Sequence, residues 1–86
     1  MPSKPPPKIK LFVKYYCGWC HEAKDYLDQL GWPYEEVEVA RNPAGLQELE
    51  RLSGQTMAPT AVIGDKLLVD FGQDELEDFL KKEGYL

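Results

Sequence analysis

The chain has 86 residues, a formal net charge of −5, a hydrophobic fraction of 43% and a charged fraction of 29%, which together are typical of one small globular domain. Nucleic acids and anionic membrane surfaces attract basic proteins, so the acidic balance argues against both as partners. No apolar run approaches the roughly 18 residues that span a bilayer, and none near the N-terminus is long enough for a signal peptide. We therefore expect a cytoplasmic protein, and we expect it to be a monomer.

The first part of the chain predicts a tail, a strand and a helix. Residues 1–7 contain four prolines and predict a flexible or polyproline-like tail before a domain that spans 8–86. Ile9–Val13 is apolar and partly β-branched, as in a buried strand. A helical period follows until Gly31, a typical helix stop. The apolar face of this helix is predicted to contain Cys20, Ala23, Tyr26, Leu27 and Leu30.

The middle of the chain predicts a second strand and a second helix. Residues 34–39 place apolar side chains among glutamates and suit a strand. Asn42 and Pro43 suit the cap and first position of a helix, which Gly54 ends. The apolar stripe of this helix is predicted to consist of Leu46, Leu49 and Leu52.

The last part predicts a hairpin and a closing helix. Thr60–Ile63 and Lys66–Val69 read as strands, and Gly64 and Asp65 between them suit a two-residue turn. Gln73–Lys82 predicts a helix. The side chains of this helix that should face the core are Leu76, Phe79 and Leu80.

The element order is therefore β-α-β-α-β-β-α, which indicates an α/β fold. The first two strands are joined through a helix, so we expect them to be parallel, with a right-handed crossover. The last two strands form an antiparallel hairpin. The prediction is one mixed four-stranded sheet flanked by helices on both faces.

Two cysteines carry the clearest chemical signal. A bridge between Cys17 and Cys20 would close almost no chain, so redox chemistry explains the pair better than stabilisation does. Cys17 lies where a strand turns into a helix, and the free N–H groups and partial charge of the first helical turn stabilise a thiolate. Cys20 is one turn further on and should be more buried. We therefore expect Cys17 to attack a disulfide and Cys20 to resolve the mixed disulfide.

Other readings of the cysteine pair are weaker. A zinc site needs about four ligands, and only His21 adds to the pair, so we predict no metal site. His21 itself is expected to be exposed on the helix. Two inert core cysteines are an alternative, because free cysteine is often buried.

Three segments resemble the glutaredoxin family, and the resemblance covers the chain from Lys8 onward. They are Lys14-Tyr15-Tyr16-Cys17-Gly18-Trp19-Cys20, Met57-Ala58-Pro59 and Val69-Asp70-Phe71-Gly72-Gln73-Asp74. Trp19 is similar to the Tyr or Phe of glutaredoxins, where thioredoxins typically carry Pro. The resemblance implies a thioredoxin-like fold, no tightly bound cofactor, and glutathione as co-substrate. It also implies disulfide-containing or glutathionylated proteins as partners.

The resemblance also implies the site. Pro59 would be a cis proline facing the cysteines, so that Ala58 offers its backbone to a substrate such as the cysteinyl part of glutathione. Lys14 would bind a glutathione carboxylate, and Tyr15 and Trp19 would form an apolar rim. The expected site consists of the catalytic residues Cys17 and Cys20 and the substrate or glutathione ligands Lys14, Tyr15, Trp19, Met57, Ala58, Pro59, Gln73 and Asp74.

Two departures from the family pattern leave alternatives open. Asp70 replaces the second glycine of a Gly-Gly pair found in many glutathione-using glutaredoxins. The pattern here is nearer to bacterial redoxins reduced by thioredoxin reductase, which would serve an enzyme such as ribonucleotide reductase. Gly18 stands where many glutaredoxins have Pro, and some members with a small residue there hold an iron–sulfur cluster. A glutathione-independent redoxin and a cluster-binding or redox-sensing module are therefore the alternatives.

Overall fold

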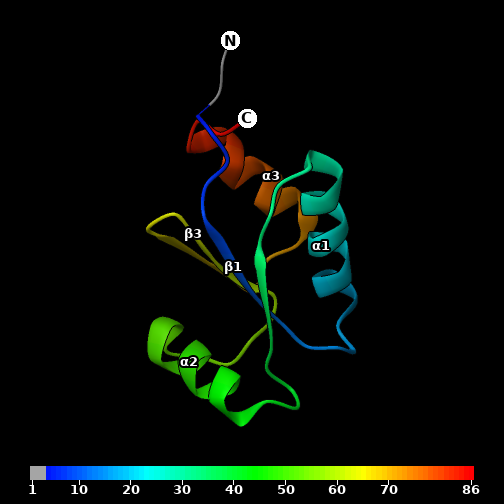
Figure 1. The fold of residues 1–86 in the computed structure, drawn as a ribbon, viewed down its shortest axis with the longest axis vertical. Helices are drawn as coiled ribbons and strands as arrows, with labels where there is room; N and C mark the ends of the chain where they lie inside the picture. The colour runs from blue at the N-terminus through cyan, green and yellow to red at the C-terminus, as the bar shows by residue number, and fades with distance from the viewer. Residues whose placement is uncertain (1–3) are drawn as a thin grey trace.

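The computed structural model describes residues 4–86, and its seven elements follow the predicted order (Figure 1). The second strand is one residue shorter at each end than the predicted range 34–39, and the other three strands have the predicted bounds. The elements are β1 (Ile9–Val13), α1 (Gly18–Leu30), β2 (Glu35–Glu38), α2 (Pro43–Ser53), β3 (Thr60–Ile63), β4 (Lys66–Val69) and α3 (Gln73–Lys82).

The four strands form one mixed sheet in the order β2-β1-β3-β4. β1 pairs with β2 in parallel, with Lys10 opposite Glu35, and with β3 in antiparallel, with Phe12 opposite Thr60. β3 and β4 form the predicted antiparallel hairpin. Gly64 begins the turn between them with a φ of 63°, which glycine adopts without steric cost. The mixed four-stranded sheet is therefore confirmed.

The side chains of β1 alternate between the two faces of the sheet. Leu11 and its neighbours at every second position pack into a core with α1 and α3. Phe12 points to the opposite face and packs with Val39 and with Leu49 of α2. Figure 1 shows this arrangement, with α1 and α3 together on one side and α2 on the other. Helices lie on both faces, as predicted, and β1 is a buried inner strand of the sheet.

The ends of the helices follow the local sequence. Gly31 ends α1 with a φ of 73°, where its N–H donates to the carbonyl of Asp28, and the N–H of Trp32 donates to the carbonyl of Leu27. This pair of bonds satisfies carbonyls that the helix end leaves free. In α1 the predicted face is correct: Cys20, Ala23 and Leu27 are buried, while Tyr26 and Leu30 pack partly buried against the core.

Asn42 and Pro43 are the cap and first residue of α2 and Gly54 ends it, as predicted, but two details differ. The side chain of Asn42 makes no capping hydrogen bond, so Pro43 supplies the start signal. Leu52 remains 41% exposed although Leu49 is fully buried. α2 covers only part of the sheet face, so the last position of its apolar stripe extends past the core.

The predicted tail lies only partly within the described residues, because residues 1–3 fall outside them. Pro7 is buried, and the backbone N–H of Lys4 donates to the carbonyl of Gly84 at 3.2 Å. The Lys4 ammonium group also lies 4.6 Å from the centre of the Tyr85 ring. Residues 4–7 therefore run beside the end of the chain.

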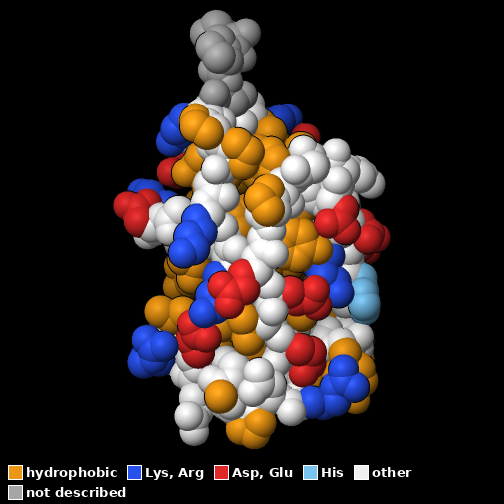
Figure 2. Space-filling model, viewed as in Figure 1, with side chains coloured by type: hydrophobic (Ala, Val, Ile, Leu, Met, Phe, Trp, Pro, Cys, Tyr) orange, Lys and Arg blue, Asp and Glu red, His pale blue; other side chains and the backbone are white. Residues whose placement is uncertain are grey.

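On the face shown in Figure 2, acidic and basic side chains are interspersed, with apolar side chains exposed between them. Among residues 4–86, no helix has both the length and the apolar character needed to cross a membrane.

Candidate active site

Cys17 lies at the junction between β1 and α1, as the sequence predicts. It occupies the N-cap position of α1 with an extended backbone, φ −94° and ψ 117°. Its N–H donates to the carbonyl of Lys14 at 3.0 Å and closes the turn that leaves β1. Its sulfur accepts the backbone N–H of Cys20 at 3.2 Å. A sulfur in this position caps the helix and lies at the positive end of its dipole.

The two cysteines have unequal environments, and both are free thiols. Cys17 is half-buried, whereas Cys20 is 1% exposed. Burial, together with the hydrogen bond to Cys17, raises the pKa of the Cys20 thiol to about 12. Cys20 is therefore protonated at neutral pH, and the more accessible Cys17 is the group that a substrate meets first.

The segment before β3 faces Cys17. The Ala58–Pro59 peptide bond is cis, and the thiol of Cys17 donates to the Ala58 carbonyl across 3.8 Å. The carbonyl of Pro59 accepts the N–H of Asp70 at 2.9 Å, which ties the segment to the end of β4. The Met57 carbonyl accepts the Thr60 hydroxyl at 2.8 Å. Within residues 4–86 nothing accepts a hydrogen bond from the Ala58 N–H.

An exposed apolar rim surrounds Cys17. The side chains of Tyr15, Tyr16, Trp19 and Met57 are between 51% and 66% exposed, although large apolar groups normally bury most of their surface. Tyr15, Tyr16 and Trp19 lie within two residues of Cys17 in the chain, and Met57 precedes Ala58, whose carbonyl accepts the Cys17 thiol. Tyr15 and Trp19 are predicted rim residues and Met57 a predicted ligand residue, whereas Tyr16 is not predicted, although the run of two tyrosines before Cys17 is a signal for it.

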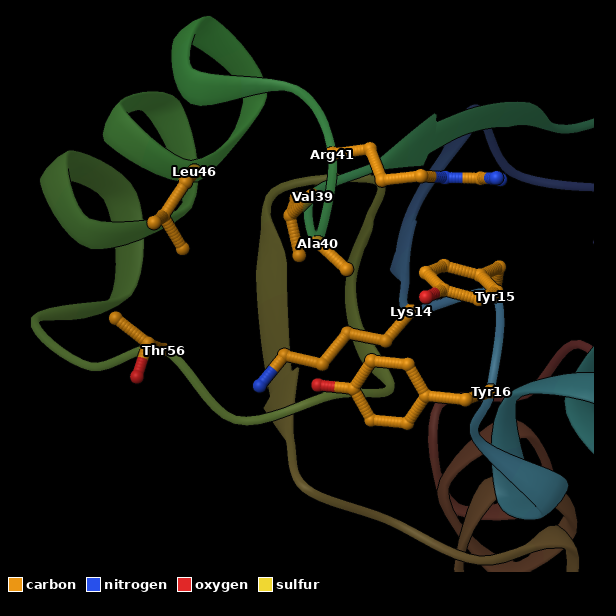
Figure 3. Close-up of a pocket in the computed structure, with 8 residues that line it drawn as sticks. All are labelled: Lys14, Tyr15, Tyr16, Val39, Ala40, Arg41, Leu46 and Thr56. Atoms are coloured by element: carbon orange, nitrogen blue, oxygen red, sulfur yellow. The ribbon is translucent and has the colours of Figure 1, made fainter.

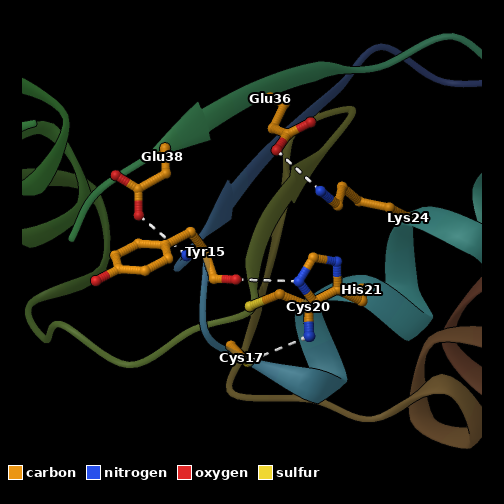
Figure 4. Close-up of polar contacts among 7 residues, drawn as sticks. All are labelled: Tyr15, Cys17, Cys20, His21, Lys24, Glu36 and Glu38. Atoms are coloured by element: carbon orange, nitrogen blue, oxygen red, sulfur yellow. Dashed lines mark hydrogen bonds and ion pairs between the residues drawn. The ribbon is translucent and has the colours of Figure 1, made fainter. Parts of the chain in front are cut away.

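Tyr15 is held at its backbone (Figure 4) and at its ring, beside Arg41 (Figure 3). Its N–H donates to the Glu38 carboxylate at 3.0 Å, and its carbonyl accepts a hydrogen bond from Nε2 of His21 at 3.0 Å. The Arg41 guanidinium lies 4.0 Å from the centre of its ring, a cation–π contact. We call these three residues with Tyr15 the Tyr15 clamp, since they fix the loop that leads to Cys17.

The Glu38 carboxylate is the centre of this clamp. Besides Tyr15, it accepts the backbone N–H groups of Ala40 at 3.0 Å and Arg41 at 2.8 Å. Burial acts to raise its pKa, but the three backbone donors outweigh that effect and hold the pKa of Glu38 below its ordinary value. Glu38 and Arg41 are not predicted from the sequence, because nothing local links them to a residue more than 20 positions earlier.

A pocket on one side of Cys17 carries positive charge (Figure 3). It encloses about 350 Å³, within the range of small-ligand sites. In Figure 3 the Lys14 side chain extends across it toward the side that bears Leu46 and Thr56. We call it the Lys14–Arg41 pocket; its lining residues are Lys14, Tyr15, Tyr16, Val39, Ala40, Arg41, Leu46 and Thr56.

A pocket on the other side carries negative charge. It encloses about 460 Å³ between the starts of α1 and α3 and brings together the predicted residues Trp19, Gln73 and Asp74. Glu75 also lies here, and its carboxylate accepts the N–H of Gly72 at 2.8 Å. We call it the Trp19–Asp74 pocket; its lining residues are Trp19, Glu22, Gly72, Gln73, Asp74 and Glu75.

The predicted site residues thus fall into three groups. Lys14 and Tyr15 line one pocket, Trp19, Gln73 and Asp74 line the other, and the segment from Met57 to Pro59 lies outside both linings. That segment faces Cys17 through Ala58. Within residues 4–86, no three His, Cys, Asp or Glu side chains are grouped to hold a metal ion.

Comparisons with known proteins agree on one family. A family model described as glutaredoxin matches residues 9–68. The chain is 28% identical to the glutaredoxin-like 8.6 kDa protein in the rubredoxin operon of Clostridium pasteurianum, over 86% of this chain and 99% of that protein. It is 31% identical to glutaredoxin 3 of Escherichia coli K12, over 64% of this chain and 66% of that protein.

A solved structure gives the same result. The crystal structure of a buckwheat glutaredoxin–glutathione complex matches with a TM-score of 0.70 and 28% identity, over 92% of this chain and 73% of that one. The predicted thioredoxin-like fold is therefore confirmed.

Proposed function

Since the chain belongs to the glutaredoxin family and is a thiol–disulfide oxidoreductase, we propose that it reduces protein disulfides or glutathione mixed disulfides through Cys17 and Cys20, with glutathione as electron donor. One observation carries the proposal. The half-buried sulfur of Cys17 caps α1, with the N–H of Cys20 at 3.2 Å and the Ala58 carbonyl at 3.8 Å.

The first step is attack by Cys17. Its thiolate attacks one sulfur of the substrate disulfide, a bond forms between the two sulfurs, and the other substrate sulfur leaves as a thiolate that takes a proton from water. The N–H of Cys20 and the N-terminus of α1 stabilise the negative charge on Cys17 before attack. The exposed rim around Cys17 gives the substrate an apolar surface to contact.

The second step is resolution by Cys20. Burial first, and then the hydrogen bond with Cys17 and its charge, raise the pKa of the Cys20 thiol. Burial persists in the mixed disulfide, but both contributions of the Cys17 thiolate end there, so the pKa of Cys20 falls. Cys20 then loses its proton and attacks the Cys17 sulfur, and the substrate leaves as a second thiol. The protein is left with a Cys17–Cys20 disulfide, so two electrons have passed to the substrate. Two molecules of glutathione restore the dithiol and leave as glutathione disulfide.

The backbone of Ala58 supports substrate binding. Its N–H has no acceptor within the described residues, and its carbonyl accepts only the Cys17 thiol hydrogen. A thiolate has no hydrogen to donate, so ionisation of Cys17 releases that carbonyl. Ala58 can then exchange both of its backbone hydrogen bonds with the cysteinyl residue of a substrate.

We expect each of the two pockets to bind one end of glutathione. We expect Lys14, which lines the Lys14–Arg41 pocket, to bind the glycyl carboxylate. We expect Gln73 and Asp74, which line the other pocket at the start of α3, to bind the γ-glutamyl end, which carries an ammonium group and a carboxylate. The buckwheat protein, which has this fold, was solved with glutathione.

The test is turnover of a glutathione mixed disulfide with glutathione, NADPH and glutathione reductase. The wild-type chain should turn over, and Cys17→Ser should not. Cys20→Ser should still reduce the glutathione mixed disulfide, because a second glutathione replaces the resolving thiol, but it should lose reduction of protein disulfides. Activity that survives Cys17→Ser would show that the nucleophile is assigned wrongly.

Asp70 favours a second candidate, in which thioredoxin reductase is the electron donor. Asp70 has a φ of 53°, a conformation that glycine adopts more easily, and it is held beside Pro59 by its N–H. A carboxylate in this position adds negative charge where the carboxylate of a γ-glutamyl group would lie. To distinguish the candidates, oxidised protein is offered separately to thioredoxin reductase and to glutathione with glutathione reductase, each with NADPH. If NADPH is consumed only with thioredoxin reductase, the electron donor is that enzyme and not glutathione.

A further inference from the structure

The candidate active site has opposite charges on its two sides. Lys14 and Arg41 line the pocket formed by the loop before Cys17, and Glu22 and Asp74 line the pocket formed after it. Arg41 is partly neutralised by Glu38, whose carboxylate lies 3.9 Å from it. A substrate that extends across Cys17 therefore meets positive potential at one end and negative potential at the other.

Ala58 determines the direction in which a peptide crosses the site. The carbonyl of Met57 already accepts the Thr60 hydroxyl, its N–H donates to Gln55, and Pro59 has no N–H. Only Ala58 in this segment keeps both backbone groups for a partner. In an antiparallel ladder, the N–H and the C=O of one residue both bond to the same opposite residue. In a parallel ladder they bond to two different residues, so a substrate residue that uses both groups of Ala58 pairs with it in antiparallel orientation.

Antiparallel pairing fixes which substrate residue reaches which pocket. When the substrate cysteine is opposite Ala58, the second residue after it is opposite Thr56, which lines the Lys14–Arg41 pocket. Side chains two apart in an extended chain point the same way, so that side chain points to the same side as the reacting sulfur. The residue before the substrate cysteine lies opposite Pro59, whose carbonyl accepts the N–H of Asp70, an acidic residue four positions before Asp74.

We propose that the protein substrates are extended segments in which a carboxylate side chain follows the reacting cysteine by two residues. This inference rests on the proposed disulfide reduction. Lys14 and Arg41 attract the carboxylate, and Asp70 and Asp74 repel a segment that carries its charges in the reverse order. Cys17 attacks the cysteine sulfur of the segment, the former disulfide partner leaves as a thiol, and Cys20 releases the segment as a second thiol.

Two acetylated peptide amides of identical composition test the direction. The forward peptide has Lys two residues before a single cysteine and Glu two residues after it, and the reversed peptide exchanges them. Each carries its cysteine as a mixed disulfide with 2-mercaptoethanol, which has no charge, and dithiothreitol recycles the enzyme. We expect kcat/KM for release of the peptide thiol to be about fivefold higher for the forward peptide, with the preference lost in about 1 M salt.

Arg41→Gln is the variant that tests the pocket. It should lower kcat/KM for the forward peptide by a clearly larger factor than for a peptide with Gln at both positions, whereas a merely structural role of Arg41 would slow both by the same factor. Lys66→Gln, at the far end of the sheet from Cys17, is the matched control for net charge and should keep the full preference.

The outcomes separate the two proposals. Three results would overturn the proposed charge order but not disulfide reduction. They are equal rates for the two peptides, a preference for the reversed peptide, and a loss of preference in Lys66→Gln as large as that in Arg41→Gln. If neither peptide is reduced faster than by dithiothreitol alone, the proposed function itself fails.

Discussion

The backbone N–H of Cys20 lies 3.2 Å from the sulfur of Cys17 and donates to it. The buried cysteine therefore supports the accessible one through its main chain, before its own thiol takes part in any reaction. This bond exists only because Cys17 is the cap of α1 and Cys20 lies in its first turn. A spacing of two residues between the cysteines thus supplies both a hydrogen-bond donor and a resolving thiol.

Alkylation should distinguish the two thiols. Burial raises the pKa of Cys20 to about 12, and its side chain is almost fully enclosed. Iodoacetamide at about pH 8 should therefore modify native protein once, at Cys17, and unfolded protein at both cysteines. Mass spectrometry of the intact chain and of its peptides measures this. A second adduct on the native protein would contradict the burial of Cys20.

Gly18→Pro should stabilise the protein. Gly18 is the first residue of α1, where Pro is favoured, and Cys17 before it already has the extended backbone that a following Pro requires. A side chain at Gly18 would meet no atom within 4 Å. We expect a gain of about 0.4–1 kcal/mol in the free energy of unfolding, since Pro restricts the unfolded chain.

Chemical denaturation measures the Gly18→Pro effect, and Gly31→Ala is its control. Gly31 has a φ of 73°, which an alanine side chain disfavours, so this variant should lose stability although its surroundings are equally open. Destabilisation by Gly18→Pro would show that the first turn of α1 needs the Gly18 N–H.

Glu38→Gln should loosen the Tyr15 clamp. The charged carboxylate accepts three backbone N–H groups, and an amide with a single acceptor oxygen cannot replace it. Hydrogen exchange should become faster at Tyr15 or at Arg41, because their N–H groups donate to different oxygens of the carboxylate and the amide keeps only one of the two acceptors. Glu50→Gln, on the exposed side of α2, should leave exchange at both positions unchanged. Unchanged exchange in Glu38→Gln would mean that the loop does not depend on this carboxylate.

The stability difference between wild type and Glu38→Gln should depend on pH. The folded-state pKa of Glu38 lies below its ordinary value of 4.5, so its contribution to stability is complete above about that pH and is lost as pH falls through the folded pKa. The difference in the free energy of unfolding between wild type and Glu38→Gln should therefore be largest near neutral pH and shrink in acid. Urea denaturation across this range measures it. A difference that is constant with pH would contradict the lowered pKa.

Gly45→Val should destabilise the contact between α2 and β2. A side chain at Gly45 would place its first carbon 2.8 Å from Cγ1 of Val37 and 3.2 Å from the backbone oxygen of Glu38. Because backbone cannot move aside cheaply, we expect a loss of about 1–3 kcal/mol in denaturant unfolding. Gly45→Ala combined with Val37→Ala should lose less than the sum of the two single variants, since the second change removes the closest atom. If the losses of the two single variants add exactly in the double variant, the strain at Gly45 does not come from the contact with Val37.

The sequence predicts the elements well because their signals are local. The apolar period of α1 and the glycine at position 31 lie within one stretch of chain, and so do the two residues of the hairpin turn. The Tyr15 clamp has no local signal: Glu38 meets Tyr15 only because β1 and β2 pair in parallel with their ends together. Leu52 fits the helical spacing of the apolar side chains of α2 and yet remains exposed. Burial at this position depends on how far the sheet extends beneath the helix, which the sequence of the helix does not encode.

The contact between Lys4 and the last residues of the chain bears on how the protein can be handled. The backbone bond from Lys4 to Gly84 brings both ends of the described chain together near the start of β1, whereas Cys17 follows the end of that strand. A circular permutant that links these ends and opens the Gly64–Asp65 turn should keep the cysteine pair intact. A fusion partner or surface tether attached at either end would likewise hang on the side away from the reacting sulfur.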